Sequence, residues 1–95
     1  MNIHDVIWLV EIEDKIIAKH QVWPEEVEEV FTSRPHVRFM ERGQREDEDL
    51  YAAFGQSEAG RYLTVYFIQK KSGAALVVTA RDMTRKEKRS YGRRR

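Results

Sequence analysis

The side chains best suited to chemistry in this sequence are one histidine and a few cations. His20, with a reference pKa of about 6.5, can take up or release a proton near neutral pH. Arg81 can hold a phosphate through two parallel N–H donors. Lys19 and Arg61 are further cations of the kind that bind phosphate. Together these residues could bind an anion and move a proton.

The charge of the chain is unevenly distributed. Residues 81–95 hold eight Lys/Arg and two acids, a local charge of +6, whereas the other eighty residues hold nine Lys/Arg and fourteen acids, a charge of −5. A basic block beside an acidic body is typical of a protein that meets a polyanion or an acidic partner. A solvated charged tail would account for the block equally well.

A short helix is predicted within the basic block. Thr84 and Glu87 have the spacing of a capping box, which predicts a helix from Thr84 to about Tyr91 that stops at Gly92. Glu87 could act as a general base, but the cap explains it as well and is the favoured role. Tyr91 could stack on a base, although packing is the simpler role for the main apolar side chain of this helix. The helix should dock lightly and expose its cations.

Two helices are predicted before the basic block. The run 5–10 suits a buried first strand. The spacing of Ile12 and Ile16 predicts a helix over 11–20, where Lys19 and His20 could simply complement the helix dipole. A second helix should begin at Pro24 and end near residue 33 or 34, before Pro35.

The rest of the chain predicts a sheet. Strands are expected at 36–42, 50–56, 61–68 and 74–80, and the run 61–68 is apolar on both faces, which favours a central position. The order is one strand, two helices, a four-stranded antiparallel meander and a short basic helix. This order indicates an α+β fold with helices packed on one sheet face, and the length predicts a single domain over 1–95.

Several classes of protein are disfavoured by what the sequence lacks. It contains no cysteine, and His4, His20 and His36 are too widely separated for metal-ligand spacing. We find no phosphate-cradling glycine loop and no nucleophile elbow. A zinc hydrolase, an NTPase and a serine hydrolase are therefore not expected, nor are a metal or another cofactor. No apolar run suits a membrane span or a secretory signal, which predicts a cytoplasmic protein without a membrane partner.

Three segments carry a resemblance to a known family. They are Ile17–Val27, the hairpin segments 51–55 and 60–65, and residues 80–91. In this order and spacing they resemble the BrnT-type toxins of bacterial type II toxin–antitoxin systems, which have a RelE-like fold and act as ribonucleases. Gln21 stands where that family usually has glycine, and Leu50 where many members have a basic residue.

The resemblance implies a metal-independent endoribonuclease that cleaves RNA by attack of the neighbouring 2′-hydroxyl and inhibits translation and growth. It also implies a cognate antitoxin, a BrnA-like ribbon-helix-helix protein, with any DNA contact made only through the complex. The candidate catalytic residues are His20, Arg81 and Glu87. The candidate RNA contacts are Lys19, Arg61, Arg85, Lys86, Lys88, Arg89 and Tyr91.

Two structural expectations follow. His20 should lie on the same side of the sheet as Arg81, within the reach of one nucleotide. The basic segment should be largely exposed in the free protein. The alternative is a non-catalytic module whose basic helix binds a nucleic acid or an acidic protein.

Overall fold

A computed structural model describes residues 3, 5–46 and 48–93 of the chain. Within that part, a five-stranded sheet has the strand order β1-β5-β4-β3-β2. The strands are β1 (Val6–Ile7), β2 (His36–Glu41), β3 (Leu50–Gln56), β4 (Tyr62–Gln69) and β5 (Ala75–Asp82), and the helices are α1 (Val10–His20), α2 (Pro24–Thr32) and α3 (Arg85–Gly92). The predicted α+β class and the antiparallel meander from β2 to β5 are confirmed.

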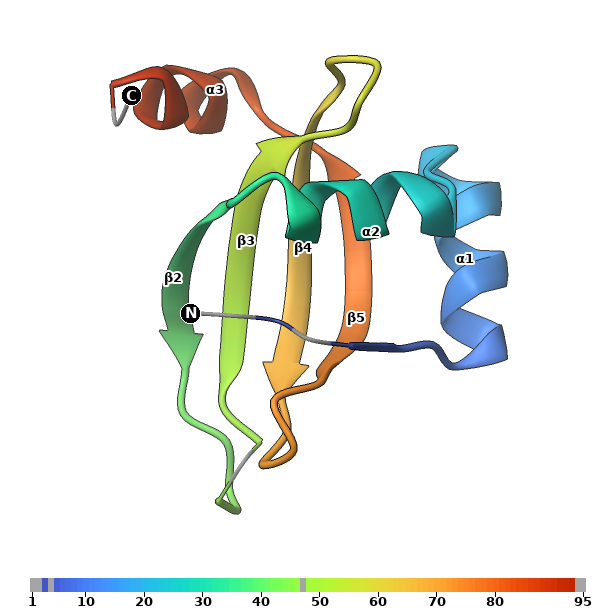
Figure 1. Cartoon of the computed structure of the whole chain (residues 1–95), viewed down its shortest axis with the longest axis vertical. Helices are drawn as coiled ribbons and strands as arrows, with labels where there is room; N and C mark the ends of the chain where they lie inside the picture. Colours follow the sequence, from blue (N-terminus) through green and yellow to red (C-terminus); the bar gives the residue numbers. More distant parts are fainter. Residues whose placement is uncertain (1–2, 4, 47, 94–95) are drawn as a thin grey trace.

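The main core lies between the sheet and the first two helices. Helix α2 crosses in front of the strands, and α1 stands beside β5 (Figure 1). Alternate residues of β4 point to this side, and Leu63, Val65 and Phe67 are fully buried there against α1 and α2. Strand β4 has a neighbour on each side, as its apolar sequence predicted.

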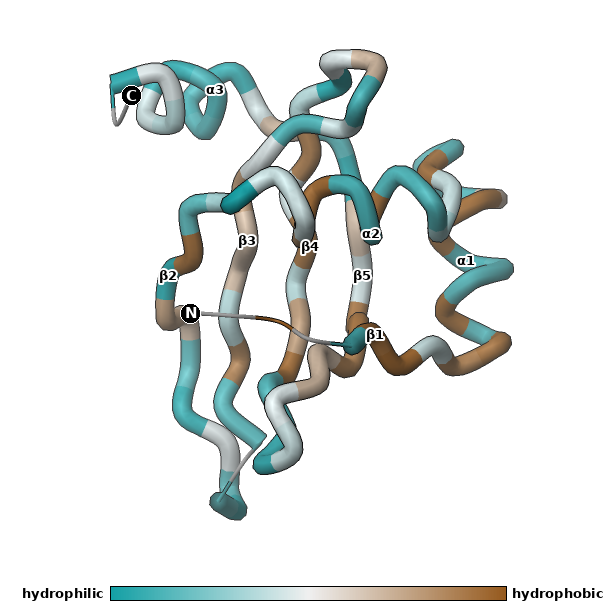
Figure 2. The backbone as a smooth tube through the Cα atoms, in the orientation of Figure 1, coloured by the Kyte–Doolittle hydropathy of each residue, from teal (hydrophilic) through white to brown (hydrophobic). Residues whose placement is uncertain are grey.

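The third helix belongs to the opposite face of the sheet. The other side chains of β4, Tyr62 and Tyr66, form a second and smaller apolar cluster with Phe54, Met83 and Tyr91. Helix α3 therefore packs on the face away from α1 and α2, so the expectation of helices on one face holds for the first two only. Figure 2 shows α3 as almost wholly hydrophilic, and none of its residues is buried.

The first strand differs from the prediction. Instead of a buried strand over 5–10, β1 has two residues, and it pairs in parallel with Ala75 and Leu76 of β5. Helix α1 already begins at Val10, and Ile7 is exposed. The apolar run thus ends at the sheet edge, because its later residues enter the first helix.

Close packing of α2 on β3 requires a glycine. A Cβ atom at Gly55 would lie 3.1 Å from the Val30 side chain and 3.2 Å from the Ser33 hydroxyl. The end of α2 therefore rests directly on the β3 backbone, which brings β2 into place beside it. Among the described residues, no helix is long and apolar enough to span a membrane.

Candidate functional site

Arg81 is held in a polar cluster on the α3 face. Its Nη1 donates to Glu87 Oε1 at 2.7 Å, and its Nη2 donates to Glu87 Oε2 at 3.0 Å and to the Tyr66 hydroxyl at 3.0 Å. The hydrogen bonds to Glu87 raise the pKa of the Arg81 guanidinium further above its usual value. Its side chain is still 27% exposed. Its Nη1 also donates to the Asp82 backbone oxygen at 3.1 Å, so Arg81 is a cation fixed by four hydrogen bonds.

Glu87 joins the helix to the sheet. Its Oε1 accepts from the Thr84 amide at 2.9 Å, while the Thr84 hydroxyl accepts from the Glu87 amide, so the predicted capping box is present. The same oxygen accepts from the Thr64 hydroxyl at 3.0 Å. The Arg81 hydrogen bonds, followed by those from Thr84 and Thr64, hold the pKa of Glu87 at about 2. A carboxylate with so low a pKa is a weak base, which favours a positioning role.

A cavity of about 260 Å³ opens beside this cluster. It lies between β2 and α3, over the β3 and β4 side chains of the α3 face. It is lined by His36, Arg38, Met40, Phe54, Tyr66, Thr84, Lys86, Glu87, Ser90 and Tyr91. Tyr66 and Glu87 line the cavity and also bond Arg81, so the cavity and the arginine form one site.

Two cavity residues from β2 and one from β4 were missed by the sequence-based prediction. His36 and Arg38 alternate along β2 and so share a face, a signal that was present in the sequence. Which face they share depends on the register of β2 with β3, in which His36 lies opposite Phe54. Tyr66 was hidden in an apolar strand whose two faces pack on different helices.

The cations of α3 are presented to solvent, as predicted. Arg85, Lys86, Lys88 and Arg89 are all exposed, while Arg94 and Arg95 lie outside the described residues. The Lys88 ammonium lies 5.5 Å from the centre of the Tyr62 ring. Tyr91 meets the same ring edge-on at 6.1 Å, so its packing role is confirmed, although it also lines the cavity.

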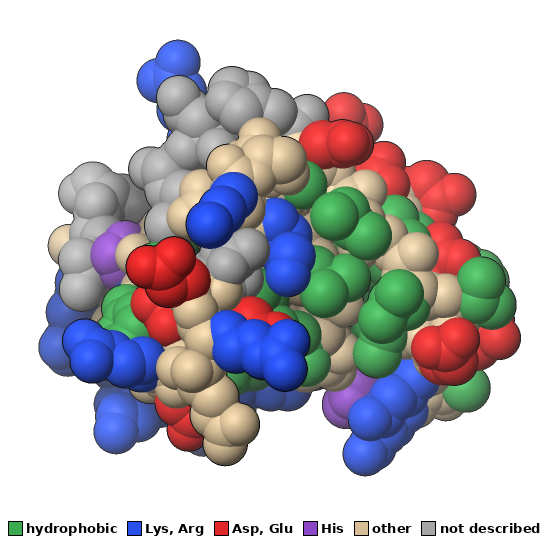
Figure 3. All heavy atoms as spheres, turned by 90° about the horizontal axis from the view of Figure 1, so that it is seen from below, with side chains coloured by type: hydrophobic (Ala, Val, Ile, Leu, Met, Phe, Trp, Pro, Cys, Tyr) green, Lys and Arg blue, Asp and Glu red, His purple; other side chains and the backbone are tan. Residues whose placement is uncertain are grey.

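The end of the molecule away from α3 has a different distribution of charged side chains. Figure 3 shows Lys/Arg and Asp/Glu side chains intermixed there. Hydrophobic side chains gather on the side of α1 and β1, where Ile7, Leu9 and Val10 are exposed. The concentration of cations is thus a property of the α3 end.

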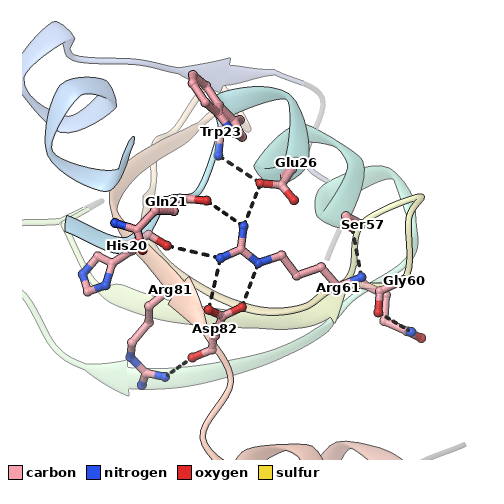
Figure 4. A network of polar contacts seen from close by, with 10 residues as sticks. His20, Gln21, Trp23, Glu26, Ser57, Gly60, Arg61, Arg81 and Asp82 are labelled. Carbon is pink, nitrogen blue, oxygen red and sulfur yellow. Dashed lines mark hydrogen bonds and ion pairs between the residues drawn. The ribbon is translucent and has the colours of Figure 1, made fainter. Parts of the chain in front are cut away.

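Arg61 is bonded within the protein on the face of α1 and α2. Its Nε and Nη2 donate to the two Asp82 carboxylate oxygens at 2.8 and 3.1 Å, and its Nη1 donates to Glu26 at 3.0 Å (Figure 4). The remaining donors reach the backbone oxygens of Gln21 at 2.7 Å and His20 at 3.2 Å. This arginine ties the α1–α2 corner to the ends of β4 and β5. The prediction that Arg61 contacts RNA does not fit this geometry.

The corner that Arg61 closes contains a left-handed residue. Gln21 has φ 53°, a conformation that favours glycine, and glycine is what the resembled family usually has at this position. The Gln21 side chain donates to the Ala18 oxygen at 3.1 Å. Arg61 binds the Gln21 oxygen, and these contacts hold glutamine in a conformation it rarely adopts.

His20 ends α1 next to this corner. The pKa of Asp82 is lowered chiefly by the hydrogen bond from Arg61, and more weakly by the positive charges of Lys88 and His20. Asp82 and Arg81 are adjacent in β5 and point to opposite faces. The expectation that His20 and Arg81 lie on the same side of the sheet stays a prediction. They share one end of β5, and Figure 4 shows the His20 ring and Arg81 both directed away from Arg61. Lys19 is exposed on the same helix.

Within the described residues, no group of three or more His, Cys, Asp or Glu side chains could hold a metal ion.

Comparison with known families decides the relationship. The family described as the ribonuclease toxin BrnT of the type II toxin–antitoxin system matches residues 8–87. The chain belongs to the BrnT family. The match includes Arg61, Arg81, Glu87 and every cavity residue except Ser90 and Tyr91.

A solved structure agrees with this assignment at the level of fold. The crystal structure of the Brucella abortus ribonuclease toxin BrnT is similar to this chain, with a TM-score of 0.61 and 22% sequence identity. The similarity covers 85% of this chain and 97% of the Brucella chain. No curated protein sequence matches the chain.

Proposed function

We propose that this BrnT-family protein is the toxin of a type II toxin–antitoxin pair and acts as a metal-independent endoribonuclease that inhibits translation and growth. The observation that carries the proposal is the family match over residues 8–87. The α3 face supports it, because a fixed arginine, a cavity and exposed cations lie together there. These are the features that a single RNA strand needs: charge for its backbone and a hollow with aromatic walls for a base.

Arg81 is the residue that stabilises charge in this proposal. Attack of a 2′-hydroxyl on the adjacent phosphorus adds negative charge to the phosphate oxygens, and a preorganised cation lowers the energy of that state. Such a contribution is worth about 10²–10³-fold in rate. Glu87 and Tyr66 hold the guanidinium in place, which reduces the reorganisation needed when the RNA reacts.

The cations of α3 would bind the RNA backbone on either side of the cleaved bond. Lys86 lines the cavity, and Arg85, Lys88 and Arg89 extend the positive surface along the helix. Lys19 remains a predicted contact for a longer RNA that passes around the end of β5. His20 remains a prediction from the sequence.

The antitoxin is proposed to act on the same surface, in the cytoplasm. A BrnA-like ribbon-helix-helix protein with an acidic segment could cover α3 and exclude RNA, and opposite charges would speed the encounter. Contact with DNA would then come from the antitoxin in the complex.

The direct test uses purified protein on a defined RNA, with and without EDTA. We expect cleavage in both conditions, with products that end in a 2′,3′-cyclic phosphate and a 5′-hydroxyl. Arg81→Ala should cut at least about 10²-fold more slowly while remaining folded by circular dichroism. This variant also controls for a contaminating nuclease, since a contaminant would be equally active in both preparations.

Two results would contradict the proposal. Cleavage that disappears with EDTA and returns with a divalent ion would indicate a metal mechanism. If the wild-type protein cuts no RNA, alone or with translating ribosomes, the alternative of a non-catalytic binding module would be favoured instead. Growth arrest on expression, relieved by the antitoxin gene, tests the cellular role separately.

A further inference from the structure

The cavity beside Arg81 has a histidine of its own. His36 is the first residue of β2 and lines the cavity together with Tyr66 and Glu87, the two residues that hold Arg81. An imidazole is the side chain best suited to proton transfer near neutral pH. His20, by contrast, does not line this cavity.

His36 and Arg81 stand in one row across the sheet. His36 pairs with Phe54, Phe54 with Thr64, and Thr64 with Arg81. Paired residues point to the same face, so all four side chains lie on the α3 side. Three strand spacings separate the ends of the row, which puts the two Cα atoms about 14 Å apart. His36 and Phe54 of this row line the cavity.

The imidazole is held in position by its neighbours. Its ring stacks on Phe54, with centroids 6.3 Å apart and planes inclined by 26°. The side chain is half-buried at the edge of the cavity. A proton-transfer group placed in this way needs little reordering when a substrate arrives.

Cations surround the position that the substrate would take. Arg38 lies two residues along β2 on the same face, and Lys86 reaches the cavity from α3. Arg81 does not line the cavity itself but bonds to Tyr66 and Glu87, which do. The cavity is thus lined by one imidazole and two cations, with the Arg81 guanidinium bonded to two of its lining residues, a composition that suits a phosphate beside a ribose.

We propose that His36 is the general base of RNA cleavage in this protein, an inference that rests on the proposed function. Neutral His36 takes the proton of the 2′-hydroxyl as its oxygen forms a bond to the adjacent phosphorus. The bond from phosphorus to the 5′ oxygen breaks, and that oxygen leaves with a proton from water. The imidazolium then returns its proton to solvent, and Arg81 stabilises the charge that builds on the phosphate oxygens.

The base must be neutral to act, so cleavage should fall as the pH drops through the titration of the imidazole. Glu87, with its pKa at about 2, stays ionised between pH 5 and 8. The charged or titratable groups that face the cavity or bond to its walls are Arg38 from β2, Tyr66 from β4, Arg81 from β5, and Lys86, Glu87 and Tyr91 from α3.

The experiment measures kcat/KM on a defined RNA from pH 5 to 8 for the wild type, His36→Ala, His36→Asn and His20→Ala. We expect both His36 variants to lose at least about 10²-fold at neutral pH. They should also lose the acidic limb of the wild-type profile, which a purely structural role would leave in place. His36→Asn keeps a similar size without titrating, so it serves if His36→Ala folds poorly.

The outcomes separate this inference from the proposed function. If the wild type cleaves and the His36 variants keep both rate and acidic limb, His36 is not the base and the ribonuclease proposal stands. If the limb disappears in His20→Ala instead, His20 is the base. A wild-type profile without an acidic limb overturns the inference whatever the variants do, and a wild type that cuts no RNA overturns both.

Discussion

Arg61 and Arg81 are each 27% exposed and ion-paired to a carboxylate, yet they occupy different surroundings. Arg61 bonds Glu26, Asp82 and two backbone oxygens, and its donors are all directed into the protein. Arg81 bonds Glu87 and Tyr66, both of which line a cavity. Two arginines of equal charge and exposure thus differ in whether their partners line a cavity, and this difference is the ground on which Arg81 is proposed as the functional cation.

The two faces of the sheet explain the difference. The face under α1 and α2 carries the main core, and a cation there must be satisfied internally, because a buried donor without a partner is costly. The α3 face is covered only in part, by a helix with no buried residue. Groups on that face can be ordered by neighbours and still meet a ligand.

The strongest test of the comparison removes the Arg61 cluster. Arg61→Ala leaves two carboxylates and two backbone oxygens without their donor, so we expect a loss of about 2–4 kcal/mol in the free energy of unfolding. Urea denaturation followed by circular dichroism measures it. Cleavage per folded molecule should change little. If a stably folded Arg61→Ala protein lost RNA binding, Arg61 would be an RNA contact, and the distinction between the two arginines would be wrong.

The second test measures how the free energy of unfolding changes at acid pH, which depends on the Arg81–Glu87 pair. The pKa of Glu87 is lowered from 4.5 to about 2 in the folded protein, so its contribution is complete above pH 4.5 and is lost as the pH falls toward 2. Glu87→Gln should lower stability at neutral pH by about 1–3 kcal/mol, because a charged partner of Arg81 is lost. Its stability should also decline less than that of the wild type between pH 5 and 2.

A matched control for this measurement is Glu25→Gln, an exposed residue in the first turn of α2. Some acid sensitivity should persist in both variants, since Arg61 also lowers the pKa of Asp82. Parallel stability curves for wild type and Glu87→Gln down to pH 2 would show that the Arg81–Glu87 pair contributes nothing.

Arg81→Lys tests whether RNA cleavage needs the planar guanidinium with its two parallel donors or only a positive charge at this position. Lysine keeps the cation but cannot bond both Glu87 oxygens and a phosphate in one plane. We expect kcat/KM for RNA to fall about tenfold, the equivalent of roughly 1.4 kcal/mol, with a smaller change in stability than in Arg61→Lys. Full activity in Arg81→Lys would show that only the positive charge of Arg81 is needed for cleavage.

The smallest expected effect belongs to the exposed cations. Lys86→Ala should weaken binding of a non-cleavable RNA severalfold and reduce the slope of log K against log salt by about 0.7, the release from one phosphate contact on a single strand. Lys71→Ala is the control, because Lys71 is 74% exposed in the loop between β4 and β5. A salt slope that is equal in wild type and Lys86→Ala would remove Lys86 from the RNA path.

Local sequence decided most of the elements. The capping box at Thr84, the proline that starts α2 and the alternating runs of β2 to β5 led to boundaries within one or two residues of the observed ones. These signals work because each depends on residues a few positions apart. The first strand was misjudged because an apolar run of this length suits a strand and a helix start equally.

Only part of the candidate site could be predicted from the sequence. Arg81, Glu87 and the basic helix were identified because their motif is contiguous, and the family resemblance rested on such segments. His36, Arg38 and Tyr66 were not, because their meeting depends on strand register, and a shift of one residue would turn each to the other face. The structure likewise placed Arg61 inside a closed corner, since partners 21 to 41 residues away set its surroundings. Sequence alone thus determined which helices, strands and charges this protein has, and only the tertiary structure decided which of those charges face a cavity.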